Sequence, residues 1–201
     1  MSRITLTKAS LSHQKGLLRT YGAVLPSLDL KRRQISAERA RARRQLQELE
    51  QRSRDLEAEV ARVCPMLAHE HIRLEGLARV VEVRLGEENL IGTRLPRVEA
   101  ISVAVAEYGL LSLPFWVDHV VGCLREALEI QVRLQVARAR IERLEEAERT
   151  VTQRFNLFEK VLIPRTRQQI RTIAIYLSDA ERAAVVNSKI AKRKKQRAQA
   201  R

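Results

Sequence analysis

The stretch Leu28–Val63 decides the fold: LDLKRRQISAERARARRQLQELEQRSRDLEAEVARV. Apolar residues recur in it at alternating steps of three and four, for example at Ala42, Leu46 and Leu49. Charged and polar residues fill most of the positions between them. An apolar stripe of this kind fills about two positions in every seven, so it repeats about every 3.5 residues. Such a stripe forms the contact face of a left-handed coiled coil. The stretch therefore predicts one long helix that pairs with another through this stripe.

The same stripe continues in both directions along the chain. Its members are Leu18, Tyr21, Leu25, Leu28, Arg32, Ile35, Arg39, Ala42, Leu46, Leu49, Ser53, Leu56, Val60, Val63 and Leu67. Most of them are apolar, and the exceptions are two arginines and one serine. We expect one helix from about Lys8 to Glu70. It should bend locally at Pro26, because proline removes one backbone hydrogen bond.

A second long helix is predicted to begin near Trp116, with Asp118 close to its N-terminus. Its stripe consists of Val120, Leu124, Ala127, Ile130, Leu134, Ala137, Ile141, Leu144, Glu148, Val151, Phe155, Phe158, Leu162, Thr166, Ile170, Ile173, Leu177, Ala180 and Ala184. From Leu162 to Ile170 the steps are four and four, which is a stutter that locally relaxes supercoiling. Pro164 lies at the same place, so we expect a kink there.

The middle of the chain, about residues 71–117, breaks the helical pattern. It holds four of the seven glycines. Residues 80–85 and 101–106 are rich in valine and isoleucine and are predicted to form short strands. Residues 86–89 and 92–93 are typical of turns. We expect a small head, which could be a β-hairpin, at the end of a helical hairpin.

Three segments follow from these patterns: an N-terminal long helix over 1–70, the head over 71–117, and a C-terminal long helix with a basic tail over 118–201. The predicted fold class is mainly α, a long antiparallel two-helix coiled coil with a small central head. Neither helix is expected to be stable alone in water, so pairing must supply the burial. The expected product is a rod with almost no central core.

Composition fits long helices better than a compact globule. Charged residues make up 31% of the chain and aromatic residues only 3%. The formal net charge of +14 points to an acidic partner, such as nucleic acid, an anionic membrane surface or an acidic protein groove. An arginine-rich, solvated helix surface would account for the same charge, and composition leaves both interpretations open. No stretch approaches the ~18 apolar residues that a membrane span needs.

Motifs of catalysis and cofactor binding are missing from the sequence. There is no glycine-rich phosphate loop and no HExxH or GxSxG motif. His69 and His71 are two residues apart, so on a helix they point to different faces, and no third ligand is near. Cys64 and Cys123 lack the spacing of a zinc site or disulfide framework. We therefore expect a protein that is not an enzyme and has no cofactor and no metal site.

Basic residues gather in two clusters along the chain. One cluster begins at Lys31 and continues to Arg54, and the other is an acid-free tail that includes Lys189, Lys192, Arg193, Lys194 and Lys195. Proteins that bind DNA or RNA neutralise phosphates with such clusters, but no aromatic stacking platform accompanies these. A nucleic-acid-binding helical protein and a basic coiled-coil scaffold remain alternatives.

One segment of the second helix carries a family resemblance. Residues 154–164 read RFNLFEKVLIP and continue RTRQQIRTI. This resembles the C-terminal signature of the D subunit of the V/A-type ATPases and ATP synthases. That signature has an R-x-N-x-hydrophobic-E stretch followed by a hydrophobic pair and proline. Residues 28–34, LDLKRRQ, resemble the family's basic N-terminal stretch. The order of helix, head and helix is the family's layout, although the head itself matches poorly.

The resemblance implies a central rotor-stalk subunit, the axle that couples ion translocation to ATP synthesis or hydrolysis. Its implied partners are the A and B subunits of the catalytic hexamer, the F subunit, and a membrane-proximal C/d-type subunit on the proteolipid ring. The implied location is cytoplasmic and peripheral to the membrane. We expect the family motif and shaft to involve Arg154, Asn156, Phe158, Ile163, Pro164, Arg167 and Ile170. The basic tail is expected to contact the hexamer.

Overall fold

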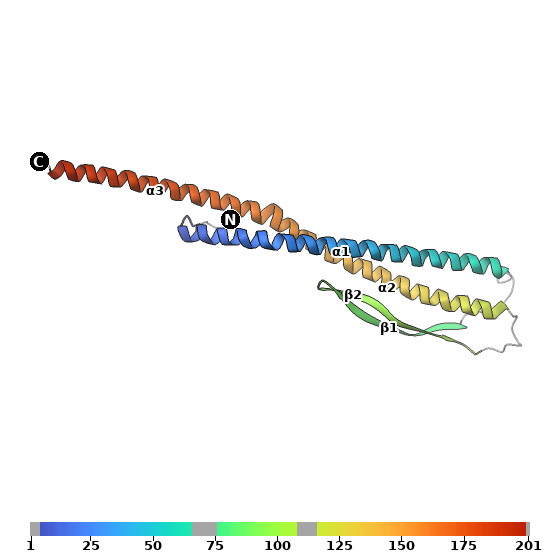
Figure 1. The fold of residues 1–201 in the computed structure, drawn as a ribbon. Helices are drawn as coiled ribbons and strands as arrows, with labels where there is room; N and C mark the ends of the chain where they lie inside the picture. The colour runs from blue at the N-terminus through green and yellow to red at the C-terminus, as the bar shows by residue number, and fades with distance from the viewer. Residues whose placement is uncertain (1–4, 66–75, 108–115, 200–201) are drawn as a thin grey trace. The chain divides into compact units, whose positions relative to one another are not determined.

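The computed structural model describes residues 5–65, 76–107 and 116–199 (Figure 1). The elements in chain order are α1 (Lys8–Val63), β1 (Ala78–Leu90), β2 (Thr93–Val105), α2 (Trp116–Asn156), the π-helix η2 (Leu157–Leu162) and α3 (Ile163–Gln199). The predicted fold class is confirmed, since long helices dominate and a β-hairpin lies between them. Predicted features at Leu67, His69, Glu70 and His71 lie outside the described residues.

Contacts divide the chain into two compact units. Unit 1 consists of Met1–Leu30 and Val151–Arg201, and unit 2 consists of Lys31–Thr150. Unit 1 therefore holds the start of α1, the end of α2, η2 and α3. Unit 2 holds the rest of α1 and α2 together with the β-hairpin.

Ion pairs show that α1 and α2 run antiparallel in unit 2. Arg39 pairs with Glu148 at 2.9 Å, Arg43 pairs with Glu145 at 2.5 Å, and Glu50 pairs with Arg138 at 3.5 Å, between nitrogen and oxygen atoms in each case. The residue number rises along α1 as it falls along α2, which is the signature of antiparallel helices. These exposed or half-exposed pairs set the register and contribute little stability each.

The predicted stripes are the buried faces of the helices. Every stripe position from Leu18 to Val60 is buried or half-buried, and so is every stripe position from Val120 to Leu177. Ile35 and Leu144 of unit 2 are fully buried, at 0% exposure. Burial of an apolar side chain of this size contributes about 1.5–3 kcal/mol, so the stripe is the main source of stability in both units.

The C-terminal end of α1 differs from the prediction, whereas its start at Lys8 agrees with it. The helix stops at Val63 rather than near residue 70, because Pro65 disfavours helical backbone at the residue before it. Pro26 lies inside α1, and the helix continues through it without a break. The missing N–H of Pro26 therefore removes one hydrogen bond from the helix without ending it.

The two strands form one antiparallel hairpin with a two-residue turn at Ile91 and Gly92. Both turn residues have positive φ, 52° and 79°, which matches the right-handed twist of the strands. Asn89 Oδ1 accepts a hydrogen bond of 2.9 Å from the Gly92 N–H. The turn predicted over residues 86–89 is wrong. Gly86 pairs with Arg97 within the ladder, and the side chain of Glu99 occupies the space that a larger residue at position 86 would need.

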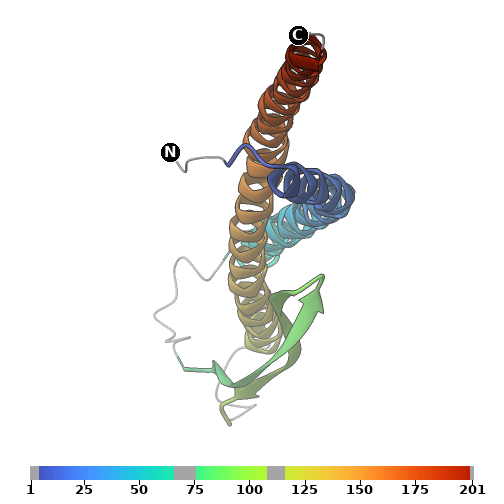
Figure 2. The ribbon, with the colours of Figure 1, turned by 90° about the vertical axis from the view of Figure 1, so that its left-hand side faces the viewer.

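The hairpin runs alongside α2 rather than beyond the end of the helix pair (Figures 1 and 2). Leu95 at its inner face is fully buried. A groove of about 390 Å³ separates the hairpin from both helices and is lined in part by Pro96, Leu49 and Val136. The head predicted from sequence is therefore a third layer on the side of unit 2.

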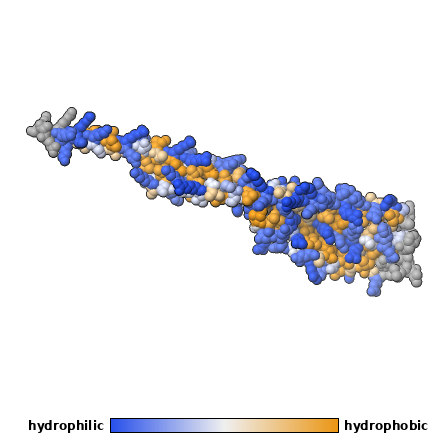
Figure 3. Space-filling model, viewed as in Figure 1, coloured by the Kyte–Doolittle hydropathy of each residue, from blue (hydrophilic) through white to orange (hydrophobic). Residues whose placement is uncertain are grey.

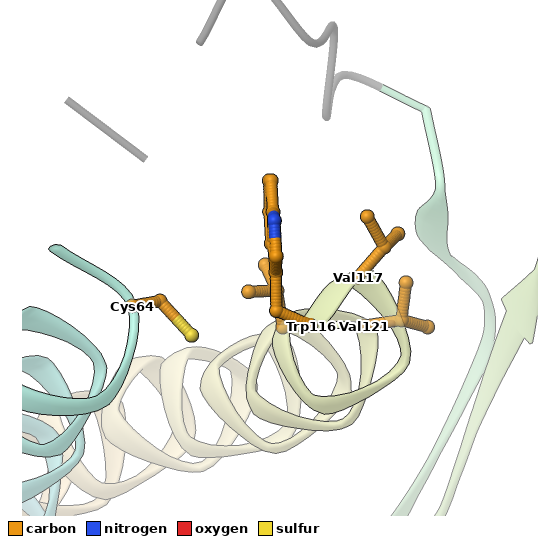
Figure 4. Packing of buried hydrophobic residues seen from close by; sticks show 5 residues of the cluster. Cys64, Trp116, Val117 and Val121 are labelled. Atoms are coloured by element: carbon orange, nitrogen blue, oxygen red, sulfur yellow. The ribbon is translucent and has the colours of Figure 1, made fainter. Parts of the chain in front are cut away.

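A cluster of buried side chains lies where the C-terminal end of α1 meets the start of α2 in unit 2. Trp116, Val117, Val120 and Val121 from the start of α2 pack with Cys64, which directly follows α1 (Figure 4). Leu77, at the base of the hairpin, packs against the same cluster. This cluster fixes the points where the chain leaves α1, enters the hairpin and enters α2.

Candidate subunit-binding surface

The family-like motif lies where α2 passes through η2 into α3, in unit 1. Arg154, Pro164 and Arg167 are exposed. Asn156, Phe158, Ile163 and Ile170 are half-buried. The structure thus brings the predicted shaft residues to one short length of helix, with apolar members toward the pairing face and basic members toward solvent.

The helix widens at this motif. Leu157–Leu162 form a π-helix, and the Ile163 N–H donates to the carbonyl of Phe158, five residues earlier. Pro164 supplies the local cause, because its ring clashes with the carbonyl four residues back in an α-helix and it has no N–H to donate. The wider turn also accommodates the extra residue of the stutter between Leu162 and Ile170. The structure has this wider turn at the place where a kink was predicted.

An aromatic contact ties the widened turn to α1 within unit 1. The rings of Tyr21 and Phe158 meet edge to face, with centroids 5.4 Å apart and planes at 88°. Both side chains belong to the predicted stripes and are half-buried. The edge-to-face arrangement is favourable for aromatic pairs, so it fixes which level of α1 faces η2.

Among the described residues of unit 1, no other helix lies beside the end of α3. Lys8, the first residue of α1, pairs with Glu181 at 3.3 Å, and α3 continues past that level (Figure 1). All residues from Asp179 to Gln196 are exposed. We call residues 182–196 the free end of α3.

Both charge and apolar surface are concentrated on the free end of α3. Lys189, Lys192, Arg193, Lys194 and Lys195 are all exposed there, and the sequence has no acidic residue after Glu181. Val185, Val186 and Ile190 are between 47% and 55% exposed. In Figure 3, hydrophobic residues lie among hydrophilic ones along this part of α3. A bare helix with this surface is suited to contact a protein that offers acidic and apolar groups.

Sequence reasoning missed an ion-pair node in unit 2. Arg140 of α2 donates from Nη2 to Glu38 of α1 and from Nη1 to Glu88 of β1, both at 2.8 Å. Its side chain is only 16% exposed. Burial alone would lower the pKa of Arg140, but the hydrogen bonds with Glu88 and Glu38 outweigh it and the pKa is raised. The node joins three elements, and residue 88 was hidden from prediction because it falls in the supposed turn.

Within residues 5–65, 76–107 and 116–199, no group of three or more His, Cys, Asp or Glu side chains could hold a metal ion. A mostly apolar groove of about 650 Å³ lies between α1 and α2 and is lined in part by Leu56, Cys64 and Cys123. Both thiols are free and buried. Burial, followed by the charge of Glu59, raises the pKa of Cys123, which disfavours a reactive thiolate.

None of the described helices combines the length and the apolar character that crossing a bilayer requires. The long helices gain their stability from pairing, as their alternating stripes indicate.

Known proteins resemble the chain along nearly its whole length. The family model for the D subunit of ATP synthase matches residues 10–193. The V-type ATP synthase D subunit of Borreliella burgdorferi is 34% identical over 194 residues, which cover 96% of this chain and 95% of the relative. The D subunit of the V-type ATP synthase of Chlamydia muridarum is 33% identical over 199 residues, covering 96% of both chains. That of Chlamydia felis is 34% identical over 196 residues, covering 96% of this chain and 94% of the relative. The chain therefore belongs to the family of ATP synthase D subunits.

Proposed function

We propose that this chain is the central-stalk axle of a rotary V-type ATP synthase. In that role it couples ion flow through the membrane ring to ATP synthesis or hydrolysis in the catalytic hexamer. Membership of the D-subunit family makes it a non-catalytic subunit that assembles with other subunits of the complex. The same membership favours the axle over a nucleic-acid-binding protein or an unrelated scaffold.

The proposed partners follow from the role of an axle. The A and B subunits would surround the free end of α3, the F subunit would bind the paired helices, and a C/d-type subunit would link the chain to the proteolipid ring. The chain would then lie on the cytoplasmic side, peripheral to the membrane. Antiparallel pairing supports this role, because paired helices can transmit a twist along their length without a globular core.

The free end of α3 is the observation that carries the proposal. It is a single helix, exposed throughout residues 182–196, basic, and free of acidic residues. A narrow tip can turn inside a ring of subunits more easily than a pair of helices. We propose that its basic residues engage acidic groups of the hexamer, which steers insertion and holds the dwell positions during rotation.

Removal of the free end tests the proposal. A chain truncated after Asn187, reconstituted with the other subunits, should hydrolyse ATP with weakened coupling to rotation or ion transport. A full-length variant with glutamine at the five tail positions should weaken coupling in the same direction. The matched control carries the same loss of charge elsewhere, by glutamine at Lys15, Arg19, Arg44, Arg62 and Arg149, which are all exposed. Unchanged torque and coupling in the tail variants would refute the proposed role of this end.

A further inference from the structure

Features that weaken a helix are concentrated at one level of unit 1. In α1, Gly16, Gly22 and Pro26 follow one another within a few turns. Glycine costs a helix about 0.5–1 kcal/mol relative to alanine, and proline removes one hydrogen bond of the helix outright. Elsewhere in the described helices, Gly122 near the start of α2 is the remaining glycine.

Hydroxyl groups compete for backbone carbonyls in the same part of α1. Thr20 Oγ1 donates to the carbonyl of Gly16 at 3.2 Å, and Ser27 Oγ donates to that of Val24 at 2.7 Å. Such bonds from serine and threonine slightly destabilise helices and often bend them. They add to the effect of the two glycines and the proline.

The facing helix is weakened at the same level. Tyr21 of α1 meets Phe158 of η2 ring to ring, so the π-helix lies opposite the stretch between Gly16 and Pro26. Lys8 pairs with Glu181 farther along, which confirms that the two segments run antiparallel there. The π-turn and Pro164 replace regular α-helical hydrogen bonds on this side. Both helices of the pair are therefore weak at one cross-section.

We infer that this cross-section is a compliant joint, at which the helix pair bends and twists more easily than elsewhere. We call it the joint, and it consists of residues 16–27 of α1 with residues 157–164 of η2 and α3. A tight aromatic contact at its centre keeps the two helices together while their backbones yield. By contrast, the helices of unit 2 carry cross-helix ion pairs and, in the stretches 31–63 and 123–150, neither glycine nor proline.

Hydrogen exchange on the full chain tests the joint without any assumption about function. We expect amides of the joint to exchange at least about tenfold faster than those around Ile35 and Leu144, since local opening needs fewer hydrogen bonds to break. Residues 182–196 are excluded from the comparison, because an unpaired helix exchanges quickly in any case. Equal protection in the joint and in unit 2 would overturn the inference.

A matched pair of alanine substitutions sharpens the test. Gly22 and Gly122 are both exposed glycines in helices, and a methyl group added at either would meet no atom within 4 Å. Gly22→Ala should slow exchange in the joint about two- to fivefold, as expected for glycine and alanine helix propensities. Gly122→Ala should slow exchange only near the start of α2. An equal response of the joint to both variants would contradict a local weakness at this level.

Substitution of Pro164 tests the other helix of the joint. Pro164→Ala restores an N–H that can bond the carbonyl four residues back, so η2 should convert toward α-helix and its amides should exchange more slowly. Unchanged or faster exchange in residues 157–168 would count against the π-turn as part of the joint.

A mechanical readout rests on the proposed axle function. In the assembled rotary complex, a probe on the chain should show narrower angular fluctuations when Gly22→Ala and Pro164→Ala are combined, and unchanged fluctuations with Gly122→Ala. A complex that turns with the same fluctuation width in all variants overturns the joint while the axle stands. A complex that hydrolyses ATP without turning the chain overturns the axle, and hydrogen exchange still decides on the joint.

Discussion

Units 1 and 2 are both built on the same kind of apolar helical stripe, but they differ in what surrounds it. In unit 2, α1 and α2 are joined by a ladder of ion pairs, covered on one side by the β-hairpin and closed by the cluster around Trp116. In unit 1, the helices pair through buried and half-buried side chains, Ile173 being fully buried, pass through the joint, and leave the free end of α3 bare. The same periodic pattern thus occurs in unit 2, where ion pairs and the hairpin join the helices, and in unit 1, where part of α3 is a single helix.

We infer from this difference that the periodicity of the stripe alone does not set the stiffness of the helix pair. Pairing of the helices depends on the apolar stripe, whereas their stiffness depends on further contacts that join the helices and on backbone hydrogen bonds that are missing. Arg140 and the hairpin add a third element to unit 2. Pro26 and Pro164 remove hydrogen bonds from unit 1. The following experiments test this contrast, beginning with the largest expected effect.

Deletion of a core side chain in unit 2 should cost the most. Leu144→Ala removes a fully buried leucine and should lower the free energy of unfolding by about 2–5 kcal/mol, because it leaves a cavity. Leu177→Ala in unit 1 removes a half-buried leucine and should cost less. Urea unfolding followed by circular dichroism measures both. Equal losses would contradict the expectation that Leu144 is the better packed of these two leucines.

Loss of the Arg140 node should cause the second largest decrease in the free energy of unfolding. Arg140→Ala leaves Glu38 and Glu88 without their shared partner and should lower the free energy of unfolding by roughly 2 kcal/mol, the scale of a lost charged hydrogen bond. The control Arg138→Ala breaks an exposed pair with Glu50 and should cost at most about 0.5 kcal/mol. Thermal unfolding compares the two. If both variants lose the same stability, the hairpin is not held by this node.

A smaller effect is expected from Cys123 as the pH rises. Its pKa is raised because burial, and then the charge of Glu59, disfavour the thiolate. The folded chain therefore holds this proton more tightly than the unfolded chain. Its contribution to stability is complete below the ordinary thiol pKa of about 8.5 and is lost as the pH rises through the raised value. Between about pH 8 and pH 10, the free energy of unfolding should fall more steeply in the native chain than in Cys123→Ala. Parallel slopes would show that this thiol is not desolvated.

The smallest effect on stability should come from the free end of α3. Neutralising Lys189, Lys192, Arg193, Lys194 and Lys195 should change the free energy of unfolding by no more than about 0.5 kcal/mol, because all five side chains are exposed. The same variant is expected to weaken coupling in the assembled complex. A large loss of stability would show that these residues hold the fold together rather than contact a partner.

Much of the fold could be predicted because the buried face of a coiled coil appears in the sequence as a regular spacing of apolar residues. The 3-4 alternation identified the buried side of both helices, including polar members such as Arg39 and Glu148, which pair with each other. The stutter and Pro164 marked the place of the π-helix, although not its form. The motif residues could be placed on one helix segment, and their contacts with partner subunits stay a prediction.

Other features depend on contacts between segments far apart in the chain, and periodicity does not carry that information. Arg140 meets Glu38 only when α1 and α2 pair, and it meets Glu88 only when the hairpin packs against α2. Gly86 looked like a turn residue, yet it serves to make room for the side chain of Glu99. The actual turn uses Ile91 at positive φ, a conformation that a β-branched residue rarely adopts and that sequence rules therefore assign to other residues.

Rotation of the chain in the working complex is the most direct test of the account. A probe can be attached through Ala40→Cys, an exposed position of α1 in unit 2, with the unsubstituted chain as the labelling control because its two thiols are buried. With the A and B subunits held to a surface and ATP supplied, we expect the probe to turn stepwise in one direction. A probe that stays still while the complex hydrolyses ATP would contradict the axle.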